Sequence, residues 1–154
     1  WAQGQPVPSD LYHYLDNTAD PIVLTVNGQP VPLTLQKGYA MLDHTWHDGD
    51  VVALTLPMPV RRVLCHPAVS ENMGKVALER GPLVYCAEGI DNDGHVLDAV
   101  LPDAATLETA VVPDLLHGVV VVHATQPSGN ITFVPYYAWA HRGVGEMAVW
   151  LPRT

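Results

Sequence analysis

Three observations predict that the sequence folds as an all-β protein, an antiparallel β-sandwich. Its 14 prolines and 12 glycines are scattered along 154 residues, so they interrupt the chain too often for long helices. Short strand-like runs alternate with turn residues, as in sandwiches. Hydrophobic residues make up 48% of the chain and charged residues 15%, which favours a packed core over disorder.

The strongest local signal is a hairpin in the first third of the chain, after a loose entry with one short strand at residues 11–15. Residues 22–26 and 31–35 flank Asn27-Gly28, a dipeptide that supplies the positive φ angles of a tight turn. Pro32 cannot donate to a sheet ladder, so the second strand is expected near an edge.

The next expected element is a second hairpin. Residues 38–46 and 51–56 are expected to pair around a turn at 47–50. The two prolines of Pro57-Met-Pro59 then interrupt the chain. This break predicts a partial first sandwich at residues 1–58 and a second sandwich at residues 59–154.

The second half of the chain predicts further strands. Gly81-Pro82 separates residues 75–79 from 83–88, because proline removes a ladder donor and glycine permits a positive φ. We expect a bulge or corner there that aims Arg80 at an acidic partner. The candidate partners are Glu79, Glu88 and Glu146. Only residues 103–110 lean towards a helix, and that segment is short. The other expected strands are residues 60–65, 96–101, 119–124, 131–138 and 147–151.

The amino-acid composition limits the kinds of partner that the chain can bind. The net charge is −9 and the basic residues form no patch, so no nucleic-acid partner is expected. No apolar run approaches the roughly 20 residues that span a bilayer, so no membrane partner is expected either. No signal peptide is visible, which leaves the compartment open and slightly favours the cytoplasm. Cys65 and Cys86 are expected to be buried free thiols rather than a bridge.

Two segments, residues 74–86 and 135–147, resemble the C-terminal β-sandwich signatures of bacterial enzymes of glycoside hydrolase family 127, the β-L-arabinofuranosidases. Glu88 and Asp91-Asn92 follow the first segment as they do in that family. The pieces that resemble the family's first sandwich occur in the same order. They are Val26-Asn-Gly28, Gly38-Tyr39, Trp46, Asp48-Gly-Asp50 and Leu56-Pro-Met-Pro-Val-Arg61.

The resemblance implies a family whose catalytic machinery lies on an N-terminal α-helical barrel, where a zinc-held cysteine has glutamate and histidine partners. None of those positions exists in this chain, so no catalytic residue, metal ligand or cofactor is expected here. Cys65 is a departure from the family pattern. The leading hypothesis is therefore a non-catalytic accessory region that packs on the barrel or mediates homodimerisation. It is supported by residues 51–54 and 119–122, which are expected to be buried on both faces, and by an open strand edge.

The second hypothesis is a carbohydrate-binding module for arabinose-containing glycans. Aromatic rings would stack on the sugar and charged groups would bond its hydroxyls. The candidate residues are Tyr136, Tyr137, Trp139, His141, Arg142 and Glu146. Strand alternation would instead send Tyr137 and Trp139 into the core. Core or inter-domain packing is the preferred interpretation of this cluster.

The third hypothesis is a fragment of an active glycosidase that hydrolyses arabinosides, with carboxylates drawn from Glu79, Glu88 and Glu146. The sequence favours structural ion pairs for these groups instead. Glu79 is expected to pair with Arg80, and Glu146 with Arg142.

Two groups of residues resemble metal ligands but are not expected to bind a metal. Cys65-His66 with Cys86 lacks the spacing of zinc ligands, and neighbouring strand residues point to opposite faces. Asp91-Asn-Asp-Gly94 with Asp98 lacks the terminal bidentate glutamate of a calcium loop and is expected to form a solvent-facing turn. No metal site is expected.

Overall fold

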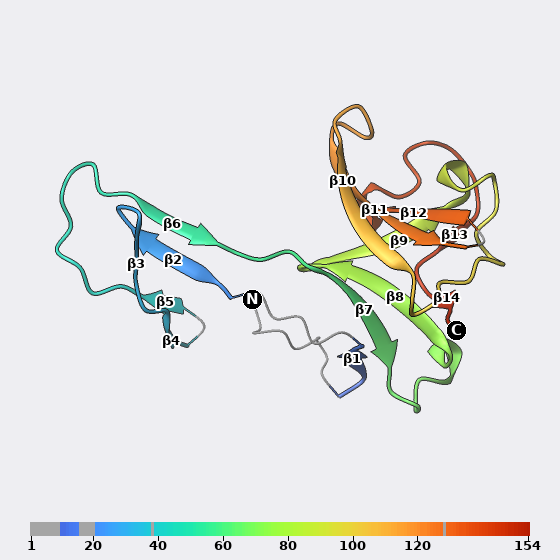
Figure 1. The fold of residues 1–154 in the computed structure, drawn as a ribbon, viewed down its shortest axis with the longest axis horizontal. Helices are drawn as coiled ribbons and strands as arrows, with labels where there is room; N and C mark the ends of the chain where they lie inside the picture. Colours follow the sequence, from blue (N-terminus) through green and yellow to red (C-terminus); the bar gives the residue numbers. More distant parts are fainter. Residues whose placement is uncertain (1–9, 16–20, 38, 128) are drawn as a thin grey trace. The chain divides into compact units, whose positions relative to one another are not determined.

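The computed structural model describes residues 10–15, 21–37, 39–127 and 129–154 (Figure 1). The chain divides into two compact units. The large unit comprises Trp1–Thr18 and Pro59–Thr154, and the small unit comprises Ala19–Met58. Every strand pair in either unit's described residues is antiparallel, which confirms the all-β fold. The assignment of residues 1–58 and 59–154 to two sandwiches stays a prediction.

The small unit is built around the predicted hairpin turn. Strand β2 (Val23–Val26) pairs with β3 (Gln29–Pro30), and Val26 lies opposite Gln29. Asn27 and Gly28 between them have φ angles of 51° and 75°, as a two-residue hairpin requires. The prediction of residues 31–35 as the second strand is wrong. Strand β3 ends at Pro30, Pro32 lies outside any strand, and the strand that begins at Thr34 belongs to another sheet.

The prediction of a second hairpin is wrong. Strand β6 (Val52–Thr55) pairs with β2, and β5 (Tyr39–Met41) pairs with β4 (Thr34–Gln36). The cause is the side chain of Asn27, which donates to Asp50 Oδ1 at 2.8 Å and accepts from the Val51 N–H at 2.9 Å. These bonds hold the start of β6 against the β2–β3 turn.

The large unit is one curled nine-stranded sheet (Figure 1). The main path runs β1-β7-β8-β9-β12-β11-β10, with β13 added to β9 and β14 added to β8. The strands are β1 (Tyr12–Tyr14), β7 (Val60–Cys65), β8 (Lys75–Arg80), β9 (Leu83–Glu88), β10 (Thr106–Val112), β11 (Val119–Gln126), β12 (Gly129–Pro135), β13 (Met147–Ala148) and β14 (Leu151–Pro152). The expected strands at residues 60–65 and 83–88 are confirmed.

Gly81-Pro82 forms a two-residue hairpin turn rather than a bulge or corner. Arg80 pairs with Leu83, so β8 and β9 meet directly across the turn. Gly81 has a φ of 57°, which confirms the expected positive angle. Glycine with positive φ at the first turn position is the arrangement of a type II′ hairpin, and proline suits the position after it.

Apolar side chains pack on both faces of the sheet. On β11, Val122 and Ala124 belong to a cluster with Tyr85 and Phe133, whereas Val121 belongs to a second cluster. The prediction of two buried faces at residues 119–122 is therefore confirmed. The same prediction for residues 51–54 is wrong, because every residue of β6 is exposed in this structure.

Three segments differ from their predicted form. Residues 96–101 form no strand, but the side chains of Val96 and Leu101 are buried in the hydrophobic core. Residues 106–112, inside and beyond the weakly helical segment, form strand β10. Strand β12 ends at Pro135, and a 3-10 turn, η3 (Tyr136–Ala138), follows it.

Helical turns are few and short in the described part of the chain. The other two are η1 (Ser70–Asn72) and η2 (Gly89–Asp91). Across the described residues, no helix is long and apolar enough to span a membrane.

Candidate functional site

The candidate site is built by the loop of residues 139–146, which links η3 to β13. The Tyr136 and Trp139 rings stack at its start, with centroids 5.9 Å apart and planes at 18°. Ala140 and Gly143 have φ angles of 66° and 112°, so the loop turns tightly. At its end, the Glu146 carbonyl accepts the Gly89 N–H at 2.9 Å, which fixes the loop beside η2.

Arg142 holds the loop to the sheet through two carboxylates. Its guanidinium donates to Asp91 Oδ1 at 2.7 Å, to Asp91 Oδ2 at 2.5 Å and to Glu88 Oε2 at 2.7 Å. The other Glu88 oxygen accepts the Ala140 N–H at 3.2 Å. The hydrogen bonds that Arg142 donates to Asp91, and then those to Glu88, raise the pKa of Arg142. We call these three side chains the Arg142 cluster.

Glu146 has a separate role at the end of the loop. Its Oε2 accepts the backbone N–H groups of Val96 at 2.8 Å and Leu97 at 3.2 Å, and Oε1 lies 3.5 Å from His95 Nδ1. The two backbone hydrogen bonds lower the pKa of Glu146, because they stabilise its charged form.

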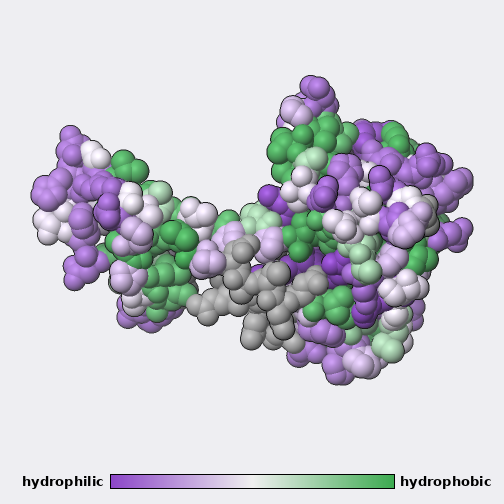
Figure 2. Space-filling view, viewed as in Figure 1, coloured by the Kyte–Doolittle hydropathy of each residue, from purple (hydrophilic) through white to green (hydrophobic). Residues whose placement is uncertain are grey.

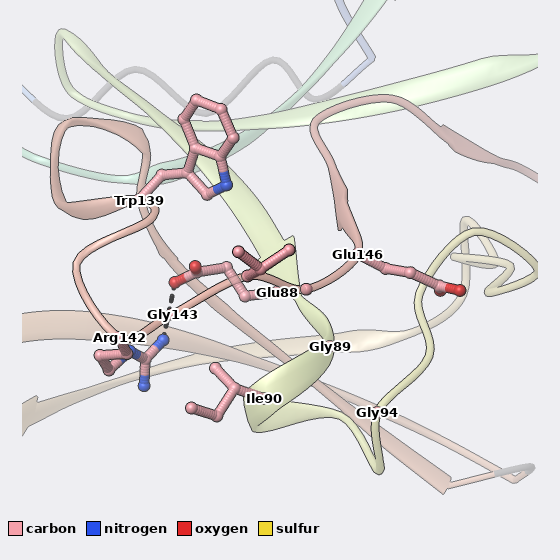
Figure 3. A pocket seen from close by; sticks show the side chains of 10 residues that line it. Glu88, Gly89, Ile90, Gly94, Trp139, Arg142, Gly143 and Glu146 are labelled. Carbon is pink, nitrogen blue, oxygen red and sulfur yellow. Dashed lines mark hydrogen bonds and ion pairs between the residues drawn. The ribbon is translucent and has the colours of Figure 1, made fainter.

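A pocket of about 260 Å³ lies between these groups (Figure 3). Trp139, Glu88 and Arg142 line it together with Ile90, Val144, Glu146 and the glycines 89, 94, 143 and 145. In Figure 3 the Trp139 indole nitrogen points towards the middle of the group, and the Glu146 side chain extends away from it. Since the cation of Arg142 is neutralised by its own carboxylates, the pocket suits a neutral, hydrogen-bonding ligand better than an anion.

The structure brings together three of the six candidate sugar-binding residues, namely Trp139, Arg142 and Glu146. The other three do not line the pocket. Tyr136 stacks on Trp139, Tyr137 is 62% exposed, and His141 Nδ1 lies 3.2 Å from the Ala138 carbonyl. The prediction that Tyr137 and Trp139 fill the core by strand alternation is wrong, because the strand ends at Pro135.

Both predicted ion pairs are wrong. Arg142 binds Glu88 and Asp91 rather than Glu146. Glu79 does not pair with Arg80. It accepts the Tyr14 hydroxyl at 3.1 Å, and burial raises its pKa.

Arg80 does not point at any acidic candidate. Its guanidinium lies beside the Tyr85 hydroxyl, and within the described residues no carboxylate pairs with it.

Sequence reasoning missed the roles of Asp91 and Asn92, which it assigned to a solvent-facing turn. Asp91 belongs to the Arg142 cluster. The Asn92 side chain donates to the Glu88 and Thr132 carbonyls and accepts the Thr132 N–H at 2.8 Å. The available signal was the presence of Glu88, Asp91 and Arg142 in the two segments that carry the family resemblance.

The two cysteines are buried and free, as expected. Burial raises the pKa of Cys86 to about 12. Cys65 is buried on β7, whereas His66 beside it is exposed, so the two residues diverge as predicted. In the described ranges, no group of three or more histidine, cysteine, aspartate or glutamate side chains could hold a metal ion.

These features define an all-β chain whose largest unit is one curled antiparallel sheet with a small surface pocket. The family models identify it further. Residues 60–152 match the glycoside hydrolase family 127 C-terminal domain, and residues 6–58 match the middle domain of β-L-arabinofuranosidases of the same family. The chain belongs to glycoside hydrolase family 127, which confirms the resemblance.

Known relatives are much longer than this chain. A non-reducing end β-L-arabinofuranosidase of Bifidobacterium longum subsp. longum is 37% identical, over 84% of this chain and 24% of its own length. A solved GH127 β-arabinofuranosidase is 38% identical with a TM-score of 0.86, over 96% of this chain and 25% of that one. A GH127 β-L-arabinofuranosidase from Geobacillus stearothermophilus T6 is also 38% identical, with a TM-score of 0.79 over 93% and 26%. The chain spans about a quarter of each.

Proposed function

We propose that this chain is a non-catalytic accessory region of a family 127 protein and serves inter-domain packing or dimerisation. The observation that carries the proposal is the apolar surface of the small unit (Figure 2). Val51, Leu54 and Trp46 are 62%, 52% and 51% exposed, and Tyr39 and Met41 are 74% and 49% exposed. Monomeric proteins rarely leave so many apolar side chains of one small unit in water, so this exposure favours a partner.

The partner favoured by the family is its α-helical barrel. The match of residues 6–58 and 60–152 to the middle and C-terminal domains supports this, because a middle domain lies between two others. The Arg142 cluster supports a structural role as well. Its buried carboxylate, Glu88, is occupied by an arginine and a backbone N–H and is not left free for proton transfer.

The test is binding of the chain to a family 127 barrel supplied in trans, measured by calorimetry. A Val51→Ser, Leu54→Ser double variant should bind about tenfold or more weakly, because burying the exposed half of each side chain contributes about half of the roughly 1.5–3 kcal/mol of full burial. The free chain should lose little stability, since both side chains are exposed before binding. Leu97→Ser is the matched control, because Leu97 in the large unit is as exposed as Val51, at 62%.

Two results together would overturn the packing role. The first is no binding in trans. The second is unchanged amide exchange in β2 and β6 when the chain is joined to the barrel. If the double variant and Leu97→Ser weaken binding to the barrel equally, the contact does not depend on the small unit.

The second candidate function is binding of arabinose-containing glycans in the pocket beside Trp139. The favouring observation is that the Trp139 ring with its indole N–H and four glycine backbones line the same 260 Å³ space. Titration with arabinose-containing oligosaccharides should change tryptophan fluorescence in the parent and not in Trp139→Phe. A parent whose fluorescence does not respond to any of these sugars lacks the site.

The third candidate, an active fragment, has a direct assay. We expect no hydrolysis of an aryl arabinoside by the purified chain, with or without added zinc. Turnover that survives further purification and disappears in Glu88→Gln would contradict the accessory role.

A further inference from the structure

Asn27 and Gly28 form the turn between β2 and β3 and expose a pair of groups that can react with each other. The backbone nitrogen of a residue can attack the carboxamide carbon of a preceding asparagine. Glycine allows this approach most readily, because it has no Cβ to hinder it. A Cβ added at Gly28 would meet nothing within 4 Å, and both residues are exposed, so water also reaches the turn.

The Asn27 carboxamide is held by the segment that leads into β6. Its Nδ2 donates to Asp50 Oδ1 at 2.8 Å, and its Oδ1 accepts the Val51 N–H at 2.9 Å. We call these two hydrogen bonds the Asn27 contacts. The first of them lowers the pKa of Asp50, because it stabilises the charged carboxylate. Expelling Nδ2 as ammonia requires that bond to break, so the Asn27 contacts oppose the attack by Gly28.

We propose that Asn27 is a site of spontaneous deamidation, which the Asn27 contacts restrain and whose product releases β6 from the β2–β3 turn. The Gly28 nitrogen bonds to Asn27 Cγ, the Cγ–Nδ2 bond breaks, and ammonia leaves with the proton of the Gly28 N–H. Water then opens the resulting succinimide ring to aspartate or isoaspartate. In sum one water is consumed and one ammonia is released, with no oxidation or reduction.

The product cannot remake the contact with Asp50. An aspartate at position 27 has a carboxylate oxygen where Nδ2 was, 2.8 Å from Asp50 Oδ1, so two negative groups would face each other. The His47 N–H and His44 Nε2 approach the other oxygen, Oδ2, at 2.8 Å and 3.4 Å, so they do not separate the two carboxylates. Isoaspartate instead adds a methylene to the backbone, which disturbs the two-residue turn. Either product leaves the start of β6 less firmly held.

The site is tested first on the purified chain. The chain is incubated at mildly alkaline pH, and the tryptic peptide that ends at Lys37 is analysed by mass spectrometry for aspartate and isoaspartate at position 27. We expect modification of Asn27 to be about tenfold or more slower than in the same chain unfolded in guanidinium chloride, because a hydrogen bond to a charged group shifts an equilibrium by about that factor. Asn130 is the internal control. It is exposed too, but the branched side chain of Ile131 after it hinders the attack.

A substitution at Asp50 tests the restraint. Asp50→Ala removes the acceptor of the Asn27 carboxamide, so Asn27 should be modified about tenfold faster than in the parent. Asp48→Ala is the matched control, because Asp48 is exposed in the same turn and its loss should leave the rate unchanged.

A substitution at Asn27 tests the consequence and does not depend on how well Asp50→Ala folds. Asn27→Asp places the product in the chain from the start. The backbone amides of β6 should then exchange with deuterium about tenfold faster than in the parent, whereas those of β9 should not change. Asn130→Asp adds the same charge at an exposed position of the large unit and should leave the exchange of β6 unchanged.

Each outcome decides one part of the proposal. Slow modification of Asn27 in the folded chain, faster modification in Asp50→Ala and faster exchange of β6 in Asn27→Asp support it. No product at Asn27 in either the folded or the unfolded chain overturns the site. Equal rates in the folded and unfolded chains overturn the restraint by Asp50, and unchanged exchange in Asn27→Asp overturns the release of β6. None of these measurements involves the barrel, so the proposed packing role depends on its own test.

Discussion

Arg142 is the side chain on which most of the candidate site depends. Replacing it with methionine leaves Glu88, which is 5% exposed, without its cation. We expect Arg142→Met to lower the free energy of unfolding by about 3–5 kcal/mol, because an uncompensated buried charge is costly. Urea unfolding at neutral pH measures this. Arg153→Met is the matched control: its partner Asp103 is 38% exposed, so the loss should be within about 1 kcal/mol. Equal losses would show that the Arg142 cluster is no more important than a surface pair.

Glu146 gives the stability of the chain a pH dependence of known sign. Its folded pKa lies below the usual value of 4.5, because it accepts the N–H groups of Val96 and Leu97. The charged form therefore stabilises the fold above about pH 4.5, and that contribution is lost as pH falls through the lower folded pKa. The stability difference between the parent and Glu146→Gln should shrink in that acid range. Glu71→Gln, at an exposed position in η1, is the control for removing one glutamate charge from the chain. A constant difference for Glu146→Gln down to pH 3 would contradict the assignment.

The sequence indicated several residues of the site but not the contacts between them. Trp139, Arg142 and Glu146 were all predicted candidates, because aromatic and charged residues clustered in one segment. Their partners lie far away in sequence: Arg142 binds Asp91 across 51 positions and Glu88 across 54. Only the sheet, which sets β13 beside β9, brings these segments together. A local pattern therefore favoured Glu146, four residues away, and that pairing was wrong.

At the scale of elements, the Gly81-Pro82 turn makes a sharp prediction. Gly81 has a φ of 57°, an angle that costs an L-residue conformational energy. Gly81→Ala should lower the free energy of unfolding by more than about 1 kcal/mol. Gly145→Ala is the control, because an added Cβ there meets nothing within 4 Å and its φ is not positive. Thermal melts of both variants make the comparison. A Gly81→Ala melt that matches the parent would show that the turn tolerates a side chain.

Strands bounded by strong turn residues were predictable, and their pairing was less so. Asn27-Gly28 and Gly81-Pro82 each set two strands in place, because a two-residue turn leaves only one antiparallel partner nearby. β6 had no such turn, and its pairing with β2 depends on the side chain of Asn27, 24 positions away from Val51. β10 was missed because alanine, threonine and glutamate favour no single structure, and its neighbour β11 decides the outcome.

For the whole molecule, the two units should open independently of each other. Among its described residues, the small unit contributes only Leu24 and Val26 to the buried apolar set, whereas the large unit has two clusters around β9, β11 and β12. Backbone amides of β2 and β6 should therefore exchange with deuterium much earlier than those of β9 and β11. Exchange at one common rate in both units would show that they form a single cooperative structure.

The rate at which the two buried thiols of the large unit are labelled can report how often the unit opens. Cys86 is fully buried in the centre of the sheet with a pKa of about 12, and Cys65 is buried on β7. A thiolate reacts only when it is formed and accessible, so a thiol reagent must wait for the sheet to separate. The labelling half-life at each cysteine then reports how often its strand leaves the sheet. A much slower rate at Cys86 than at Cys65 would mean that the sheet unzips from the β1–β7 side, which would give the order in which this chain comes apart.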